Sequence, residues 1–331
     1  MKGIIMAGGE GTRLRPLTCD CPKPMIRLMN RPVMQYALEL LKKHGVTDIA
    51  ATLGYLPDAI RDHFGDGEAF GVQLRYTVER APLGTAGGVR QAADFLDETF
   101  AVLSGDGVTD LDIARAARFH RERGAVATLV LKHADNPLEY GVVDLDPQGR
   151  VRSFHEKPDW ADVASDTVNT GIYILEPEVL DRVPEGRPCD FGRELFPRMV
   201  AEGLPVYGFV TEDYWCDVGD VRAYLGAHID AMEGRVRLDR LAALARGEAF
   251  GGRAVQLPGA RVDRAAVLEG EGYETDLIEF VDFEHSPKNL MIRARYTGHH
   301  RPGGREKAEL LRQRYGFEQS LLRLTEGAAE K

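Results

Sequence analysis

The sequence predicts an α/β fold in which a mostly parallel sheet is flanked by helices and followed by a small C-terminal extension. Two observations predict it. In the first part of the chain, short β-like apolar runs alternate with longer segments whose apolar residues recur at helical spacing. The chain also has 331 residues, 44% of them apolar, which is enough to bury a substantial core. Such alternation is typical of a parallel sheet covered on both faces.

Four apolar runs form the first half of the predicted sheet. Strands are expected at 3–7, 47–53, 72–78 and 100–106. Helices are expected between and after these strands, at 32–44, 57–64, 85–96 and 112–123. Because a helical segment follows each strand, the strands are expected to run parallel.

The pattern changes after a further strand at 127–131. A β-hairpin is expected across 139–158, with its turn at Pro147, Gln148 and Gly149. The remaining elements of this part are strands at 167–175 and 204–210 and helices at 176–183, 191–202 and 220–232. These elements complete a compact domain, which we expect to span residues 1–232.

The rest of the chain has a different character. Residues 233–258 have the composition of an Arg-rich connector, and residues 259–331 form an extension of uncertain fold. Within it, 259–270 has the spacing of one or two turns of a hexapeptide β-helix, which is too short to form a core of its own. Further expected elements are strands within 275–283 and 289–297 and a helix at 305–324.

Charge and cysteine usage exclude several function classes. A formal net charge of −10 and a pI near 5.5 argue against binding to nucleic acid or to anionic membranes, which requires a broad basic surface. The four cysteines form no C-x-x-C pair and are too few for a disulfide scaffold, which favours a cytoplasmic setting. Glycines interrupt the apolar start, so we expect no signal peptide, and no apolar stretch is long enough for a membrane span.

Residues 7–26, AGGEGTRLRPLTCDCPKPMI, place glycines and cations directly after the first predicted strand. A glycine-rich turn in this position lets backbone N–H groups approach a phosphate closely. A P-loop is excluded because no Gly-Lys-Ser/Thr sequence follows, and a dinucleotide-binding turn is excluded because Leu14 stands where a third glycine is needed. A flexible turn alone would not require Arg13 and Lys23 beside it.

The stretch 8–18 matches G-G-x-G-[ST]-R-L-x-P-L-T at every fixed position, and 22–24 is the accompanying P-K-P. In these motifs the chain resembles the sugar-1-phosphate nucleotidyltransferases, whose nucleotide-diphospho-sugar transferase fold has a Rossmann-like sheet. The details of 1–232 are most similar to mannose-1-phosphate guanylyltransferase-like proteins. The resemblance implies that Arg13 and Lys23 are catalytic cations on the phosphates of a nucleoside triphosphate. It also implies nucleotide-binding positions at Ala7, Gly8, Gly9, Gly11 and Thr12.

Two aspartates follow predicted strands. Asp106 ends the run FAVLSGD, at the sheet edge where ligands of such folds bind, and Asp217 lies in YWCDVG. Taken alone, each is explained as well by a helix cap or a turn. Together with the glycine loop they match the catalytic metal-binding pair of the resembling family, which implies Mg²⁺ as the cofactor. A reaction between two anionic substrates needs such imported positive charge.

Two further sets of residues follow from the resemblance. On the nucleotide side, Glu79 is expected to accept from a base N–H, with Gly84 and Thr85 at the start of the next helix. Without the resemblance, this segment is explained by a turn leading into a helix. The sugar-phosphate side is expected to use Gly141, Glu156, Lys157, Asn169 and Gly171. Taken alone, the adjacent Glu-Lys pair is explained by an exposed ion pair of little energetic value.

The implied function is transfer of a nucleotidyl group from a nucleoside triphosphate to a sugar 1-phosphate, giving pyrophosphate and, as the expected product, GDP-mannose. Two alternatives stay open: a glucose-1-phosphate uridylyl- or thymidylyltransferase, and a non-catalytic regulatory protein that binds nucleotide sugars. The motifs leave the base, the sugar and homo-oligomerisation undetermined. Residues 272–298 resemble the closing segment of class I methyltransferases, but no glycine-rich cofactor loop accompanies them, so no methyl transfer is expected.

Overall fold

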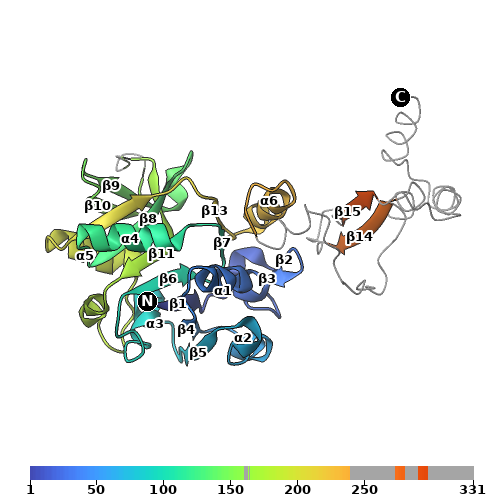
Figure 1. Ribbon diagram of the computed structural model, residues 1–331, viewed down its shortest axis with the longest axis horizontal. Helices are drawn as coiled ribbons and strands as arrows, with labels where there is room; N and C mark the ends of the chain where they lie inside the picture. Colours follow the sequence, from blue (N-terminus) through green and yellow to red (C-terminus); the bar gives the residue numbers. More distant parts are fainter. Residues whose placement is uncertain (160–162, 164, 239–272, 280–289, 297–331) are drawn as a thin grey trace, which may run out of the picture. The chain divides into compact units, whose positions relative to one another are not determined.

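The computed structural model describes residues 1–159, 163, 165–238, 273–279 and 290–296. The chain divides into two compact units, Met1–Glu248 and Ala249–Lys331. Figure 1 shows the helices and strands of each unit. All predicted site residues belong to the first unit.

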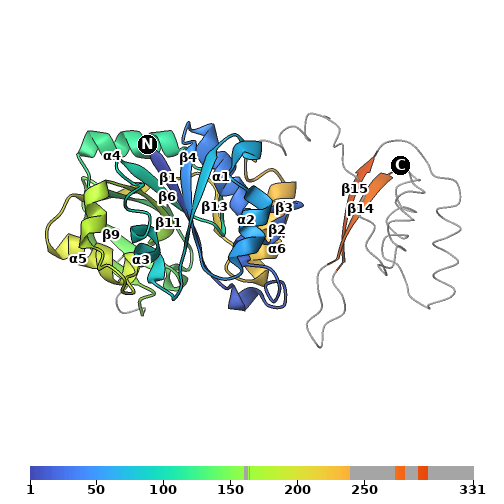
Figure 2. The same ribbon diagram turned by 90° about the horizontal axis from the view of Figure 1, so that it is seen from below.

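The first unit is built on a sheet of nine strands, and its parallel part comes first in the chain. β1 (Lys2–Ala7) lies between β6 (Phe100–Ser104) and β4 (Asp48–Leu53), which are labelled in Figure 2, and β5 (Gln73–Val78) lies beyond β4 (Figure 1). All three pairings are parallel, which confirms the predicted sheet. The carboxyl ends of these strands therefore meet at one edge, where the residues that follow them lie close together.

Four helices alternate with these strands, as predicted. They are α1 (Val33–Lys43), α2 (Pro57–Phe64), α3 (Gly84–Arg90) and α4 (Ile113–Arg123). α3 ends at residue 90 instead of the expected 96, because the N–H groups of residues 91–93 donate to carbonyls three residues back, those of residues 88–90, instead of four. α4 has Asp112 as its N-cap, whose side chain accepts from the N–H of Arg115.

Both faces of the parallel strands are buried. Consecutive residues point to opposite faces, so Ile4 of β1 belongs to one apolar cluster and Ile5 to the other. The first cluster includes Val89 of α3, and the second includes Leu38 of α1 and Phe64 of α2. Burial on both faces explains why these strands are continuous apolar runs in the sequence.

The sheet continues through antiparallel strands on the other side of β6. β11 (Thr167–Leu175) pairs with β6, with β8 (Ala127–His133) and with β9 (Gly141–Leu145). The predicted hairpin is confirmed, since β9 pairs with β10 (Val151–Glu156), and β12 (Val206–Val210) runs parallel to β8. The result is a mixed, mostly parallel central sheet flanked by helices.

Shorter elements connect these parts. The predicted helix at 176–183 is the 3₁₀ helix η6 (Pro177–Arg182), and the one at 191–202 is a π-helical turn, η7 (Phe191–Leu195), that continues into α5 (Phe196–Ala201). α6 (Val221–Met232) follows the N-cap Asp220. Near the site lie η1 (Thr12–Leu14), η2 (Lys23–Met25), β7 (Gly107–Thr109) and β13 (Trp215–Asp217). The remaining short elements are β2 (Arg27–Leu28), β3 (Arg31–Pro32), η3 (Glu68–Phe70) and η4 (Pro137–Glu139).

In the second unit, β14 (Tyr273–Glu279) and β15 (Leu290–Tyr296) form an antiparallel pair, which agrees with the two expected strands. The expected β-helix spacing at 259–270, the expected helix at 305–324 and most of the expected connector lie outside the described residues. The limit of the first domain at residue 232 stays a prediction. No helix in the described part of the chain has both the length and the apolar character needed to cross a membrane.

Candidate active site

Asp106 lies beside the glycine-rich loop because the strands that precede them are neighbours. The loop leaves the carboxyl end of β1, and Asp106 follows β6, which pairs with β1. The N–H of Gly105 donates to the carbonyl of Met6 at 2.8 Å, which extends this pairing past the end of β6. The fold therefore brings Asp106 next to the glycine loop, at the sheet edge where it was predicted to lie.

The loop itself is folded around Gly11. This residue has a φ of +66°, and a Cβ here would lie 2.8 Å from the Cβ of Lys23, so only glycine fits without strain. The hydroxyl of Thr18 donates to the carbonyl of Gly11 at 2.7 Å and closes the loop. A Cβ on Gly9 would meet no atom within 4 Å, so this backbone is open to an approaching phosphate.

Asp217 reaches Asp106 through a short antiparallel strand pair. β13 pairs with β7, which places Asp217 opposite Gly107, and the N–H of Val218 donates to the carbonyl of Asp106 at 3.2 Å. Neither strand is longer than three residues, and no local pattern links them. The juxtaposition of the two aspartates is thus a product of the fold.

Lys23 lies between the two carboxylates. Its Nζ forms an ion pair with Oδ2 of Asp106 and lies 3.5 Å from Oδ1 of Asp217, and its side chain is 10% exposed. Burial acts to lower the pKa of Lys23, but the negative charges of both aspartates outweigh burial and raise it. Lys23 is therefore charged in the folded protein.

The two carboxylates differ in environment. Burial acts to raise the pKa of Asp106, but the charge of Lys23 and hydrogen bonds from Lys23 and the Ser104 hydroxyl outweigh it, so the pKa is lowered. Burial and the negative charge of Asp106 raise the pKa of Asp217, although Lys23 and Arg13 oppose this shift. Asp106 is thus the more firmly ionised of the pair.

Arg13 approaches the same cluster from the exposed side of η1, across Gly219. A Cβ on Gly219 would lie 2.9 Å from Oδ2 of Asp217 and 3.1 Å from Nη2 of Arg13. Any side chain at Gly219 would therefore push these two charged groups away from their positions. We did not predict this residue, and the glycine in YWCDVG was its one signal in the sequence.

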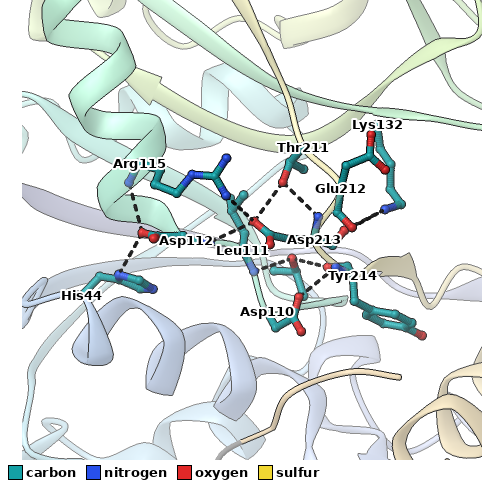
Figure 3. Close-up of polar contacts among 11 residues, drawn as sticks. His44, Asp110, Leu111, Asp112, Arg115, Lys132, Thr211, Glu212, Asp213 and Tyr214 are labelled. Atoms are coloured by element: carbon teal, nitrogen blue, oxygen red, sulfur yellow. Dashed lines mark hydrogen bonds and ion pairs between the residues drawn. The ribbon is translucent and has the colours of Figure 1, made fainter. Parts of the chain in front are cut away.

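A hydrogen-bonded network holds the strand that carries Asp217 (Figure 3). The carboxylate of Asp110 accepts from the N–H of Tyr214 at 2.8 Å and from the N–H of Arg237 at 2.9 Å. The hydroxyl of Thr109 donates to the carbonyl of Tyr214 at 2.6 Å. Asp110 therefore joins the residues after β7 to the start of β13 and to the segment after α6.

On the nucleotide side, Glu79 is held by the protein. Its Oε2 accepts from the N–H of Leu83 at 3.0 Å, and a Cβ on Gly88 would lie 2.5 Å from its Oε1. Gly8 lies next to Glu79, and its carbonyl accepts from the N–H of Tyr55 at 3.4 Å. The carboxylate thus fixes the loop before α3 next to the glycine loop.

The start of α3 is tied to the segment before η7. Gly84 has a φ of +71°, and a Cβ on it would lie 2.6 Å from the carbonyl oxygen of Cys189. The hydroxyl of Thr85 donates to Asp190 and accepts from the N–H of Phe191, each at 2.9 Å. These contacts give Gly84 and Thr85 structural roles, while their contact with a nucleotide stays a prediction, as it does for the buried Ala7 and the exposed Thr12.

On the predicted sugar side, Glu156 lies at the end of β10 between two backbone glycines. A Cβ on either Gly141 or Gly192 would lie 2.8 Å from its Oε2. Burial raises the pKa of Glu156, and the negative charge of Asp190 adds to the shift. Lys157 follows with a φ of +48°, and its N–H donates to the carbonyl of Tyr140 at 3.0 Å.

Asn169 and Gly171 lie where the pairing of β11 with β8 is irregular. The Oδ1 of Asn169 accepts from the N–H of Gly171 at 3.2 Å, and its Nδ2 donates to the hydroxyl of Tyr173 at 2.9 Å. A Cβ on Gly171 would lie 3.8 Å from the Cβ of Ser104, whose hydroxyl donates to Asp106. The fold thus places this part of the sugar side next to the carboxylates.

Comparison with known proteins gives the family. A family described as nucleotidyl transferase matches residues 2–234. The chain belongs to the nucleotidyl transferase family. It is 43% identical over 238 residues to a UTP–glucose-1-phosphate uridylyltransferase from Synechocystis, a match covering 68% of this chain and 61% of that protein. It is 33% identical over 295 residues to a mannose-1-phosphate guanylyltransferase from Mycobacterium tuberculosis, covering 83% of this chain and 82% of that protein.

Solved structures agree with the fold of this nucleotidyl transferase. A Bacillus anthracis structure described as a glucose-1-phosphate thymidylyltransferase in complex with sucrose is 26% identical, with a TM-score of 0.64. The match covers 76% of this chain and 98% of that one. The expected Rossmann-like sheet and the expected sugar-1-phosphate nucleotidyltransferase relationship are thereby confirmed.

The carboxylate pair of this nucleotidyl transferase fits a magnesium ion that shares its ligands with phosphates. Among the described residues, no group of three or more His, Cys, Asp or Glu side chains is arranged to hold a metal alone. Mg²⁺ commonly uses one or two carboxylates and takes its other ligands from substrate phosphates and water. Asp106 and Asp217, beside the open backbone of the glycine loop, are such a donor set.

Proposed function

We propose that this chain transfers a nucleotidyl group from a nucleoside triphosphate to a sugar 1-phosphate, and that its substrates are GTP and mannose 1-phosphate. The observation that carries the reaction class is the cluster of Lys23, Asp106 and Asp217 beside the glycine loop. A protein that only binds nucleotide sugars could dispense with both carboxylates, whereas metal-assisted phosphoryl chemistry needs them. Membership of the nucleotidyl transferase family supports the same reaction class.

In the proposed reaction, a phosphate oxygen of the sugar 1-phosphate attacks the α-phosphorus of the triphosphate. A new P–O bond forms, and the bond from the α-phosphorus to the bridging oxygen breaks, which releases pyrophosphate. The attacking phosphate is largely a dianion near pH 7, so the chain does not need a general base. Nucleophile and leaving group are both anionic, and the site must therefore supply positive charge.

The required charge is substantial. Two unit negative charges about 4 Å apart repel by roughly 4 kcal/mol at an effective dielectric constant near 20. Arg13 and Lys23 supply the positive charge of side chains that lie beside the glycine loop. Asp106 and Asp217 would hold Mg²⁺, which adds charge neutralisation at the phosphates when it is bound.

The substrates are proposed to lie on the two sides of this cluster. On the nucleotide side, the backbone of residues 7–12 receives the phosphates, with the base near Glu79 and the start of α3. On the sugar side, Glu156 and Asn169 bind hydroxyl groups, and Lys157 binds the phosphate. This arrangement puts the reacting phosphates of both substrates at the carboxylate pair.

Guanine and mannose are chosen because the guanylyltransferase match covers more of this chain than the uridylyltransferase match does. The Mycobacterium tuberculosis guanylyltransferase matches 83% of this chain, whereas the Synechocystis uridylyltransferase matches 68% at higher identity. That higher identity, 43%, favours UTP and glucose 1-phosphate as the second candidate pair. The four cysteines are free in the structure, which supports a reaction in the cytoplasm.

A substrate matrix tests the proposal. GTP, UTP, dTTP and ATP are each paired with mannose 1-phosphate and glucose 1-phosphate in the presence of Mg²⁺, and pyrophosphate release is followed. We expect the GTP and mannose 1-phosphate pair to give the highest kcat/KM. Fastest release with UTP or dTTP and glucose 1-phosphate would assign the second candidate. Nucleotide-sugar binding without pyrophosphate release from any pair would overturn the enzymatic proposal in favour of a regulatory protein.

A further inference from the structure

The ammonium group of Lys23 lies between the two carboxylates that are proposed to hold the metal ion. It forms an ion pair with Asp106 and lies 3.5 Å from Asp217. The side chain of Lys23 is 10% exposed, and those of Asp106 and Asp217 are 22% and 35% exposed. Solvent therefore screens these contacts far less than it screens a surface ion pair.

A divalent ion and this ammonium would compete for the two carboxylate oxygens that Lys23 contacts, Oδ2 of Asp106 and Oδ1 of Asp217. Magnesium coordinates oxygens at about 2.0–2.1 Å, so an ion on Oδ2 of Asp106 would meet Nζ of Lys23 at the same oxygen. The charges of +2 and +1 would then repel at short range in a partly desolvated site. Metal binding through these two oxygens consequently requires Lys23 to move away.

Phosphates on the glycine loop would attract the Lys23 ammonium away from the carboxylates, and the loop lies next to the Lys23 side chain. The stem of Lys23 packs on Gly11, because a Cβ on Gly11 would lie 2.8 Å and 3.1 Å from the Cβ and Cγ of Lys23. The ammonium is therefore attached next to the backbone that would receive phosphates. Phosphates bound there would attract the ammonium and compete with the two carboxylates.

We propose that Lys23 is the resident counter-cation of the carboxylate pair, and that a divalent metal gains Asp106 and Asp217 only when Lys23 turns to phosphates on the glycine loop. This proposal rests on the proposed function, because it takes those phosphates to be the nucleotide's. According to this proposal, the protein without bound nucleotide binds divalent metals weakly, because Lys23 neutralises the carboxylate pair. It also couples metal binding to nucleotide binding through one side chain.

The experiment titrates the folded, full-length chain with Mn²⁺ alone and follows free Mn²⁺ by electron paramagnetic resonance. Lys23→Met removes the charge and keeps an unbranched side chain that is one atom shorter, and it should bind Mn²⁺ at least about tenfold more tightly than the unmodified protein. Lys23→Gln is a second neutral variant if the first does not fold. Lys42→Met is the matched control, because Nζ of Lys42 bonds the carbonyl of Phe70, away from the carboxylates.

Adding Asp106→Asn to the Lys23→Met variant should remove the gain in Mn²⁺ affinity. Neutral variants that bind Mn²⁺ no more tightly than the unmodified protein would overturn the proposal. So would a gain that survives Asp106→Asn, since the ion would then lie elsewhere. Pyrophosphate release by the unmodified protein is scored separately, so the proposed function can stand when the counter-cation proposal fails.

Discussion

Replacement of Gly219 by alanine is expected to slow the reaction without unfolding the protein. The new Cβ would lie 2.9 Å from Oδ2 of Asp217 and 3.1 Å from Nη2 of Arg13. Normal van der Waals contact is about 3.5 Å, so each charged group must shift by roughly half an ångström. A misplacement of about 1 Å can cost about a hundredfold in rate, so half of that predicts a kcat about tenfold lower.

The assay is pyrophosphate release at saturating substrates, repeated over a range of Mg²⁺ concentrations. Gly226→Ala in α6 is the matched control, because a Cβ at that position would meet no atom within 4 Å. The control should keep the kcat of the unmodified protein. The melting temperature of Gly219→Ala should stay within a few degrees, because Gly219 lies outside the positive-φ region and its new contacts are with two side chains.

Two results would refute this reasoning. Gly219→Ala with an unchanged kcat and an unchanged Mg²⁺ dependence would show that the positions of Arg13 and Asp217 do not limit the reaction. An equal loss of activity in Gly226→Ala would show that the effect comes from the glycine substitution in this region and not from the contact.

Three further predictions concern other parts of the first unit. Asp106→Asn and Asp217→Asn should each lower kcat by about a hundredfold or more while the protein still unfolds in one cooperative thermal transition, since a metal contributes several kcal/mol to such reactions. Near-normal pyrophosphate release in both would remove the metal assignment. Gly84→Ala should lower the free energy of unfolding in urea by about 2 kcal/mol more than Gly186→Ala does. Both glycines have positive φ, but only at Gly84 would the new Cβ lie 2.6 Å from a carbonyl oxygen, that of Cys189. Equal losses in the two variants would show that this contact does not matter. Burial lowers the pKa of His120 below 6.5, so the unfolded chain binds a proton that the folded protein excludes. The melting temperature should therefore fall as the pH drops below about 6.5, and it should fall less steeply in His120→Gln. Parallel pH profiles of the two proteins would contradict this role of His120.

Much of the site was predictable because its residues follow strands of one parallel sheet. The glycine loop follows β1, and Asp106 follows β6. The apolar runs that predict these two strands therefore also predict that the residues after them share one edge of the sheet. Lys23 was recognisable from the motif, but its contact with both aspartates was not. That contact depends on the path of the loop around Gly11, and the sequence alone does not give this path.

The parts that escaped prediction depend on long-range contacts of very short elements. β7 and β13 have three residues each, and a strand of that length carries no periodic signal. Gly84 stays a predicted nucleotide-binding glycine, but the motif did not indicate its close approach to Cys189, whose carbonyl oxygen would lie 2.6 Å from a Cβ on Gly84. A motif identifies a residue whose identity matters, but only the fold shows which neighbouring atoms constrain that residue.

The hydrogen bond from Arg237 to Asp110 bears on where the first unit can be shortened. The family match ends at residue 234 and the expected domain ends at residue 232, yet the N–H of Arg237 holds the carboxylate that anchors the start of β13. A fragment that ends at residue 232 or 234 would keep every proposed catalytic side chain. It would lose the hydrogen bond from Arg237 to Asp110, which supports the strand that carries Asp217. A fragment reaching Glu248, where the compact unit ends, would keep it.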